Sequence, residues 1–227
     1  MDIFKGFDEK TLIFFRQLGS HNSRDWFESH RQNYEDYVLK PAQKFVMEMG
    51  QRLRTLSPEV HAIPNIDKSI FRIYRDIRFS KDKTPYKTNL AIFFWDGPRK
   101  KNDNSGYYLH VDANKVFIGL GLYIFPKDIL QQFRDLISKP VEAENLLSVL
   151  QKIRDMGYGA GGHGSKRVPR GYDADYHYAE LLKYKGIYTW HECPPPEELF
   201  TSKFIDWCYN IYEVMAPLHY WIRKKLL

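Results

Sequence analysis

Residues 106–122 read Gly106-Tyr107-Tyr108-Leu109-His110-Val111-Asp112-Ala113-Asn114-Lys115-Val116-Phe117-Ile118-Gly119-Leu120-Gly121-Leu122. Two runs of alternating residues flank a turn-type tetrapeptide, and this pattern predicts an antiparallel β-hairpin. One face of the hairpin is apolar and is expected in the core: Tyr107, Leu109, Val111, Val116, Ile118 and Leu120. The opposite face carries Tyr108, His110, Gly119 and Gly121. Glycines inside a strand indicate close approach by a ligand or by another backbone.

Helical patterns lie on both sides of this hairpin. Asp8 is predicted to cap a helix that ends near Gly19, and Asn22 to cap one that runs to about Leu39, where Pro41 breaks or restarts it. In the last third we expect helices over 126–137 and 142–156, a short helix near 178–182, a strand near 187–190 and a helix from 197 onward. Helices, then an antiparallel sheet, then helices define an α+β fold. We expect a single domain over residues 1–227.

The composition is that of a globular protein. The chain has 227 residues, of which 43% are hydrophobic and 27% charged, values that exclude collagen, a coiled coil and wholesale disorder. The longest apolar run, residues 90–95, is too short to cross a membrane. The start has no secretory pattern, and two cysteines fifteen residues apart form no disulfide framework or zinc motif. A cytoplasmic protein without a membrane partner is therefore expected.

Positive charge is concentrated in residues 72–87. The chain carries a net charge of +6, and this stretch alone contributes +4. Its cations and acids are Arg72, Arg75, Arg78, Lys81, Lys83 and Lys87 with Asp76 and Asp82. A solvated strand face usually carries Lys and Glu, whereas Arg is suited to planar, bidentate contacts with carboxylate or phosphate. The alternative is a solvated charged strand and loop with no ligand.

A strand over 70–79 is predicted here, because the residues are β-branched or aromatic. Phe71, Ile73, Ile77 and Phe79 would then face the core, and the even positions 72–78 would form a row of charged and phenolic groups. Arg75 does not fit this alternation, so the strand is either bulged there or Arg75 is buried with an acid. Residues 80–85 have turn chemistry and lead to Tyr86 and Lys87.

The stretch from Arg72 to Lys87 closely resembles the hallmark of a widespread, mainly bacterial family that is known as a domain of unknown function. Further matches to that family follow in the family's order: residues 22–27, 106–109, 119–123 and 166–172. They cover nearly the whole chain. The resemblance implies a single-domain cytoplasmic protein, and it implies no activity, cofactor or catalytic residue.

Other motifs are weak. The glycine-rich residues 157–162 fit G-x-G-x-x-G but follow a helix, so a flexible loop or lid is favoured over a dinucleotide site. Arg167 and Arg170 lie next to that loop, either on an exposed basic segment or as a second wall of an anion site. Ser80 and Lys83 have S-x-x-K spacing without the partner motifs of penicillin-recognising enzymes. No metal site is predicted, since His110 and Asp112 are expected as a hydrogen-bonded or exposed pair.

We interpret the charged stretch as a cleft for a small anionic ligand that bears phosphate or carboxylate. The expected ligand-binding residues are Arg72, Arg75, Arg78, Lys81, Lys83, Tyr86, Lys87, Arg167 and Arg170. If the protein is an enzyme, which the sequence leaves open, Asp76 and Asp82 are the acid–base candidates; otherwise they brace the cations. The alternatives are nucleic-acid binding by the same basic, tyrosine-rich surface and a structural module whose cations pair internally. The sequence identifies no cofactor, substrate or oligomeric state.

Overall fold

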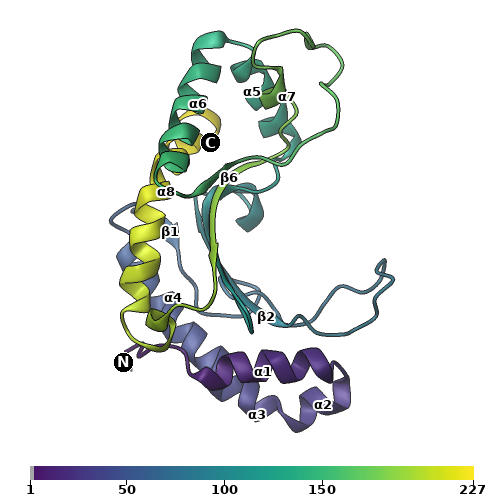
Figure 1. Cartoon of the computed structure of the whole chain (residues 1–227), viewed down its shortest axis with the longest axis vertical. Coiled ribbons are helices and arrows are strands. Elements are labelled where there is room, and N and C mark those ends of the chain that lie inside the picture. The colour runs from purple at the N-terminus through teal and green to yellow at the C-terminus, as the bar shows by residue number, and fades with distance from the viewer. Residues whose placement is uncertain (1–2) are drawn as a thin grey trace. The chain divides into compact units, whose positions relative to one another are not determined.

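A computed structural model describes residues 3–227 and confirms the predicted α+β class. The six strands form one antiparallel sheet in the order β1-β2-β3-β4-β6-β5 (Figure 1). The strands are β1 (Val60–His61), β2 (Asn89–Asp96), β3 (Gly106–Asp112), β4 (Val116–Leu122), β5 (Gly159–Gly161) and β6 (Ile187–Cys193). Helices precede and follow the sheet in the sequence, as expected, and residues 127–182 add further helices between β4 and β6.

The helices fall into an N-terminal and a C-terminal group. The first group comprises α1 (Glu9–Ser20), α2 (Arg24–Ser29), α3 (Arg31–Tyr34), the π-helix η1 (Glu35–Leu39) and α4 (Lys40–Leu53). The second comprises α5 (Lys127–Ile137), α6 (Pro140–Asp155), α7 (Ala179–Leu182) and α8 (Phe204–Leu226). Two short 3-10 helices, η2 (Lys101–Asp103) and η3 (Glu197–Phe200), lie in connections.

The backbone contacts divide the chain into two compact units whose segments alternate along the sequence. Unit 1 comprises Met1–Phe94, Tyr108–Ile118 and Glu192–Asn210. Unit 2 comprises Trp95–Tyr107, Gly119–His191 and Ile211–Leu227. The charged stretch 72–87 lies wholly in unit 1, whereas Arg167 and Arg170 belong to unit 2.

The predicted hairpin is confirmed as β3 and β4. Every side chain expected on its apolar face is buried, with at most 1% exposure: Tyr107, Leu109, Val111, Val116, Ile118 and Leu120. The Asp112 carboxylate accepts hydrogen bonds from the backbone N–H of Asn114 and Lys115 at 2.8 and 3.0 Å, which closes the turn. Strict alternation therefore located this element correctly, because it depends on local sequence alone.

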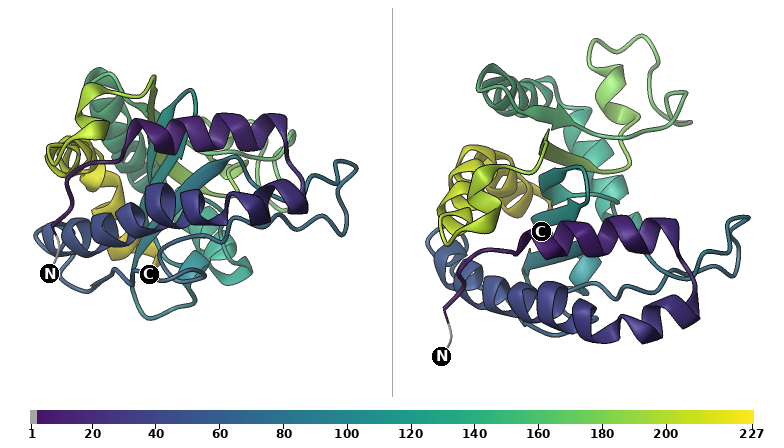
Figure 2. Two further views of the ribbon diagram at one scale, coloured as in Figure 1. Left: turned by 90° about the horizontal axis from the view of Figure 1, so that it is seen from below. Right: turned by 60° about the horizontal axis from the view of Figure 1, so that its bottom comes forward.

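The N-terminal helices of unit 1 differ from the prediction in their details. Asp8 caps α1 as expected, through a 2.8 Å bond from Lys10 N–H. The cap of α2 is Ser23, not Asn22, and the predicted single helix is split into α2, α3 and η1 before Pro41 starts α4. In both views of Figure 2, α1 runs beside the α3–α4 segment. Together they bury an aromatic cluster that includes Phe4, Phe7, Phe45 and Phe204.

Unit 2 buries a hydrophobic core that includes residues of α5, α6 and the C-terminal half of α8. The glycine-rich segment, predicted as a flexible loop or lid, is instead the edge strand β5, which pairs with β6 (Gly159 opposite Trp190). A side chain at Gly159 would collide with the Trp190 ring, since an added Cβ would lie 2.1 Å from that ring. Gly159 therefore makes room for an aromatic ring.

The prediction of a strand over residues 70–79 is wrong. Only isolated bridges occur there: Ile70 pairs with Ile66 and with Ile92, and Tyr74 pairs with Tyr86. Ile73 is buried as expected, but Phe79 is 95% exposed instead of lying in the core. Backbone groups beyond Tyr74 bond to the loop itself, so the segment leaves the sheet.

We expect Asn22→Ala to lower the free energy of unfolding by about 1–3 kcal/mol, because it leaves backbone groups of buried Tyr86 without partners. The Asn22 amide donates to Tyr86 O at 2.9 Å and accepts from Tyr86 N–H at 3.1 Å. Urea denaturation followed by circular dichroism measures the change. Asn33→Ala, an exposed site on α3, is the matched control; equal effects of the two substitutions would contradict the anchoring role.

Candidate functional site

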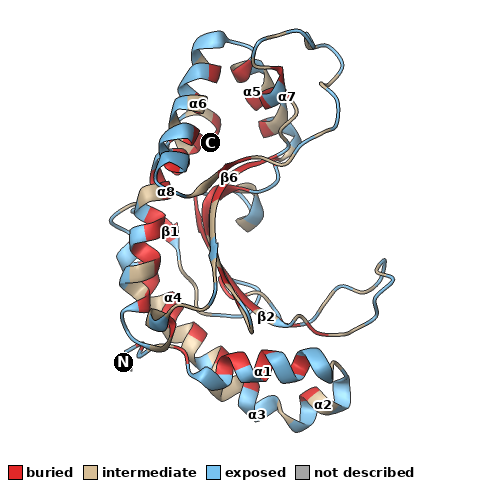
Figure 3. Cartoon of the chain, in the orientation of Figure 1, coloured by how far each residue is buried: buried red, intermediate tan, exposed pale blue. Residues whose placement is uncertain are grey.

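Residues 75–85 form a loop that projects from unit 1 beside β2 (Figures 1 and 2). Two backbone hydrogen bonds close its root: Arg75 N–H donates to Pro85 O and Lys87 N–H to Ile73 O, each at 2.8 Å. The loop is mostly exposed in Figure 3, in contrast to the buried β2 beside it. We call residues 75–85 the arm. The charged stretch thus consists of the arm and of residues 72–74 and 86–87, which we call the root of the arm.

Tyr86 anchors the arm to the N-terminal helices. Its side chain is only 2% exposed, and its ring stacks on Phe27 of α2 with the centroids 4.3 Å apart. Tyr74, on the opposite limb, lies 5.2 Å from the Tyr86 ring and is 45% exposed. Tyr86, one of the predicted ligand residues, is therefore a buried anchor of the arm. Tyr74, which is not one of them, is partly open to solvent.

Within the arm, two arginines are paired with its two aspartates. Arg78 binds Asp76 through both carboxylate oxygens, with N–O distances of 2.9 and 2.7 Å. Arg75 binds Asp82 at 2.5 Å and also donates to the side chain and the carbonyl of Thr84. Of the two alternatives for Arg75, a strand bulge or burial with an acid, neither holds in full: Arg75 is paired with an acid, but its side chain is 27% exposed. The Arg75–Asp82 pair links the two limbs of the arm, whereas Asp76 and Arg78 lie two residues apart on the same limb.

Both arm carboxylates are strongly acidic. The side-chain hydrogen bonds from Arg78 lower the pKa of Asp76 to about 2. The pKa of Asp82 is also lowered to about 2, first by the backbone N–H of Thr84 and then by Arg75. An acid–base catalyst works best when its pKa is near the working pH, so this geometry favours bracing over proton transfer.

The root of the arm brings Arg72 and Lys87 together. Lys87 Nζ donates to the backbone carbonyl of Arg72 at 3.0 Å. Burial, and then the nearby Arg72 charge, lower the pKa of Lys87, and the charge of Asp67 offsets only part of this. No carboxylate in the described range 3–227 forms an ion pair with either side chain. Like charges held together at a partly buried position favour an anion between them.

Three aromatic rings of unit 1 lie beside this root. Phe71 and Tyr108 have centroids 6.4 Å apart, and Tyr108 and Phe117 6.1 Å apart. Lys87 Nζ lies 5.6 Å from the Phe71 ring centroid, a cation–π distance. We call Phe71, Tyr108 and Phe117 the aromatic row. All three residues are half-buried, so none of them belongs to the fully buried core.

The remaining predicted residues lie apart from the root or are exposed. Lys83 Nζ donates to Ile77 O at 2.8 Å inside the arm, and Lys81 is exposed. Arg167 and Arg170 are exposed on the segment between β5 and α7 in unit 2, so a second wall of the site stays a prediction. His110 and Asp112 are hydrogen-bonded at 2.9 Å, as expected.

Sequence reasoning selected Arg72 and Lys87 as ligand-binding residues. It assigned Phe71 to the core and selected neither Tyr108 nor Phe117 for the site. Cross-strand neighbours supply the missing signal: Phe117 faces the Tyr108 side of the predicted hairpin. No group of three or more metal-ligating side chains occurs among residues 3–227.

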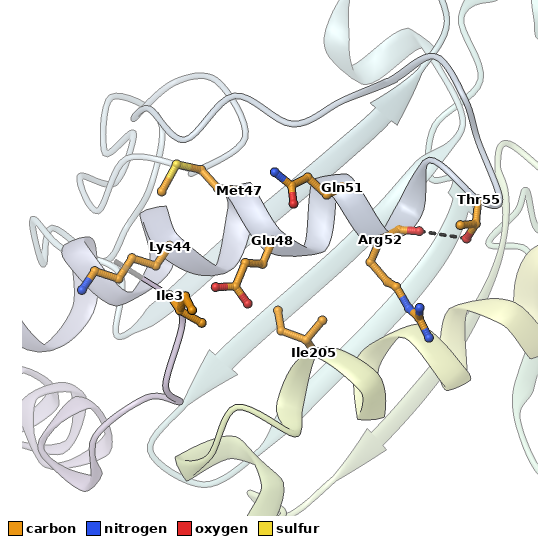
Figure 4. Close-up of a pocket in the computed structure, with 8 residues that line it drawn as sticks. All are labelled: Ile3, Lys44, Met47, Glu48, Gln51, Arg52, Thr55 and Ile205. Atoms are coloured by element: carbon orange, nitrogen blue, oxygen red, sulfur yellow. Dashed lines mark hydrogen bonds between the residues drawn. The ribbon is translucent and has the colours of Figure 1, made fainter. Parts of the chain in front are cut away.

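A separate cavity of about 600 Å³ in unit 1 contains none of the predicted residues (Figure 4). It is lined by Ile3, Lys44, Met47, Glu48, Gln51, Arg52, Thr55 and Ile205. Arg52 at its edge lies over the Tyr209 ring at 4.4 Å and close to Asp206, so its cation is engaged. This cavity is mixed in character and has no cluster of like charge.

Fold and site together define an α+β protein with a basic arm and a half-buried aromatic row. Residues 10–221 match the model of the family described as conserved hypothetical protein (DUF2461), and the chain belongs to this family. No curated protein matches the chain significantly. None of the helices in the described part of the chain is long and apolar enough to cross a membrane.

We expect Arg78→Ala to raise the pKa of Asp76 back toward its ordinary value, because Arg78 is the main cause of its depression. Arg75→Ala should raise the pKa of Asp82 by less, since the Thr84 N–H remains. A depressed pKa stabilises the folded arm above the ordinary aspartate pKa, and this stabilisation is lost as the pH falls toward about 2.

Carboxyl-carbon NMR titration of Asp76 and Asp82 in the wild-type protein and both variants measures these shifts. Asp173 and Asp175, in unit 2, serve as internal references because they lie outside the arm. Unchanged titration of Asp76 in the Arg78→Ala protein would show that the ion pair does not form in solution.

Proposed function

We propose that the protein binds nucleic acid through unit 1, with Arg72 and Lys87 on phosphates and the aromatic row against bases. The observation that carries this proposal is the pair of cations at the root, which forms no ion pair with a carboxylate of residues 3–227 and lies beside three half-buried aromatic residues. Cationic grooves combined with stacking rings are typical of proteins that bind single-stranded nucleic acid.

Net charge supports the same conclusion. The chain has a charge of +6, and residues 72–87 hold +4 of it on a projecting, exposed segment. A polyanion gains from a long-range positive potential and from counterion release, and neither effect requires an enclosed cavity. An extended partner therefore fits a projecting arm better than a small ligand does.

A small anionic ligand in a cleft is the weaker hypothesis. The arginines that would have bound it, Arg75 and Arg78, already hold Asp82 and Asp76, and Arg78 is exposed. Only Arg72 and Lys87 remain as a convergent pair. No reaction is proposed, because both candidate acid–base groups are engaged in ion pairs and are ionised at neutral pH.

We expect the double substitution Arg72→Ala/Lys87→Ala to weaken binding of a labelled single-stranded oligonucleotide about 100-fold or more, given about 1.5–3 kcal/mol for each of the two charged hydrogen bonds. Fluorescence anisotropy from ~50 to ~200 mM salt should also show a log–log salt slope that is shallower by about 1.4, or about 0.7 for each phosphate contact. The single variant Arg72→Ala is measured as well. Because Arg72 is exposed, this substitution should leave the fold intact, so a loss of affinity in this variant is not an effect of misfolding.

The charge-matched control is Lys5→Ala/Arg54→Ala, which removes two exposed cations of unit 1 outside the arm and its root. Equal loss of affinity in the control would mean that only net charge matters. Tighter binding of a mononucleotide than of the oligonucleotide would favour the small-ligand hypothesis.

A further inference from the structure

Phe79 is the most exposed of the large apolar side chains in the described part of the chain, at 95%. It lies in the middle of the arm, between the limbs that start at Arg75 and end at Pro85. Burying a phenylalanine side chain contributes roughly 1.5–3 kcal/mol compared with leaving it in water. The arm lacks this contribution and leaves the aromatic ring in solvent.

Phe79 is exposed although the arm around it contains internal hydrogen bonds. Lys83 Nζ bonds Ile77 O at 2.8 Å, and Ser80 N–H bonds the same carbonyl at 3.3 Å. The Arg75–Asp82 pair links the two limbs of the arm, and the Arg78–Asp76 pair lies within one limb. A braced arm loses little conformational entropy when a partner covers its tip, so the ring is presented in an organised form.

The charge around Phe79 indicates the chemistry of that partner. The arm contains four cations and two acids, a net charge of +2. The guanidinium carbon of Arg78 lies 5.8 Å from the Phe79 ring centroid. The partner must therefore offer an apolar slot close to negative charge. A base step in a nucleic acid has both features, because planar bases are flanked by phosphates.

We propose that Phe79 is a wedge that inserts between neighbouring bases of the bound nucleic acid and unstacks them. This inference rests on the proposed function and adds how the nucleic acid is bound. The root binds phosphates, the aromatic row contacts bases, and the arm separates two neighbouring bases. Apolar side chains inserted between base steps act in this way in architectural nucleic-acid-binding proteins.

The test uses an oligonucleotide that carries 2-aminopurine at a central position, because the emission of this base rises when it is unstacked. Anisotropy of the same complex reports binding independently. We expect wild-type protein to raise the 2-aminopurine emission. Phe79→Ala should abolish that rise and weaken binding about 5- to 150-fold, the loss of one stacking contact. Phe79→Trp, which keeps a ring, should retain both signals.

Ile3→Ala is the matched control, since Ile3 is another exposed apolar residue of unit 1, at 68%, and lies outside the arm. It should leave both signals unchanged. Circular dichroism confirms that Phe79→Ala is folded, as expected for an exposed side chain. Vesicles of phosphatidylcholine and phosphatidylserine replace the oligonucleotide in a parallel assay.

Binding by the wild-type protein with unchanged 2-aminopurine emission, and equal affinity for Phe79→Ala, would overturn the wedge and leave the proposed function standing. Failure of the wild-type protein to bind the oligonucleotide at low salt would overturn the proposed function itself. Phe79-dependent binding to the vesicles without binding to the oligonucleotide would replace the wedge by insertion into an anionic membrane surface.

Discussion

The way in which Tyr86 is held determines the geometry of the whole region from residue 70 to residue 89. Its ring is buried against Phe27 of α2, and the Asn22 amide pairs with both its backbone N–H and its carbonyl. One limb of the arm is thereby fixed to the N-terminal helices, and Lys87 follows directly. Lys87 N–H bonds Ile73 O, which places the lysine ammonium at the carbonyl of Arg72. This anchor therefore places the Lys87 ammonium beside the backbone of Arg72.

The sequence predicts the elements whose stabilising contacts are local. The hairpin of β3 and β4 has alternation on both strands and a turn aspartate that bonds its own neighbours, so its core face is evident from the sequence. The strand predicted over 70–79 fails for the opposite reason. Beyond Tyr74, its backbone is satisfied by side chains and carbonyls of the arm, and β-propensity carries no information about those partners.

Part of the candidate site follows from composition, and part depends on strand pairing. The charge of +4 in residues 72–87, half of whose cations are arginines, is enough to indicate an anion-binding stretch from the amino-acid sequence alone. Which cations are neutralised is not visible in the sequence, since Asp76 and Asp82 each have several arginines and lysines within reach. The proximity of Phe71 to Tyr108 requires residues far apart in the chain to lie side by side.

The internal ion pairs change what the charge of the arm can do. Exposed ion pairs contribute little to folding stability, so Arg75 and Arg78 are not explained by stability alone. Their carboxylate partners weaken the attraction of the arm for a single small anion. The arm is therefore a moderately basic projection with an aromatic residue at its tip. At its root, Arg72 and Lys87 form no ion pair with a carboxylate of residues 3–227. A distributed polyanion can contact both regions at once, and each contact then raises the effective concentration of the other.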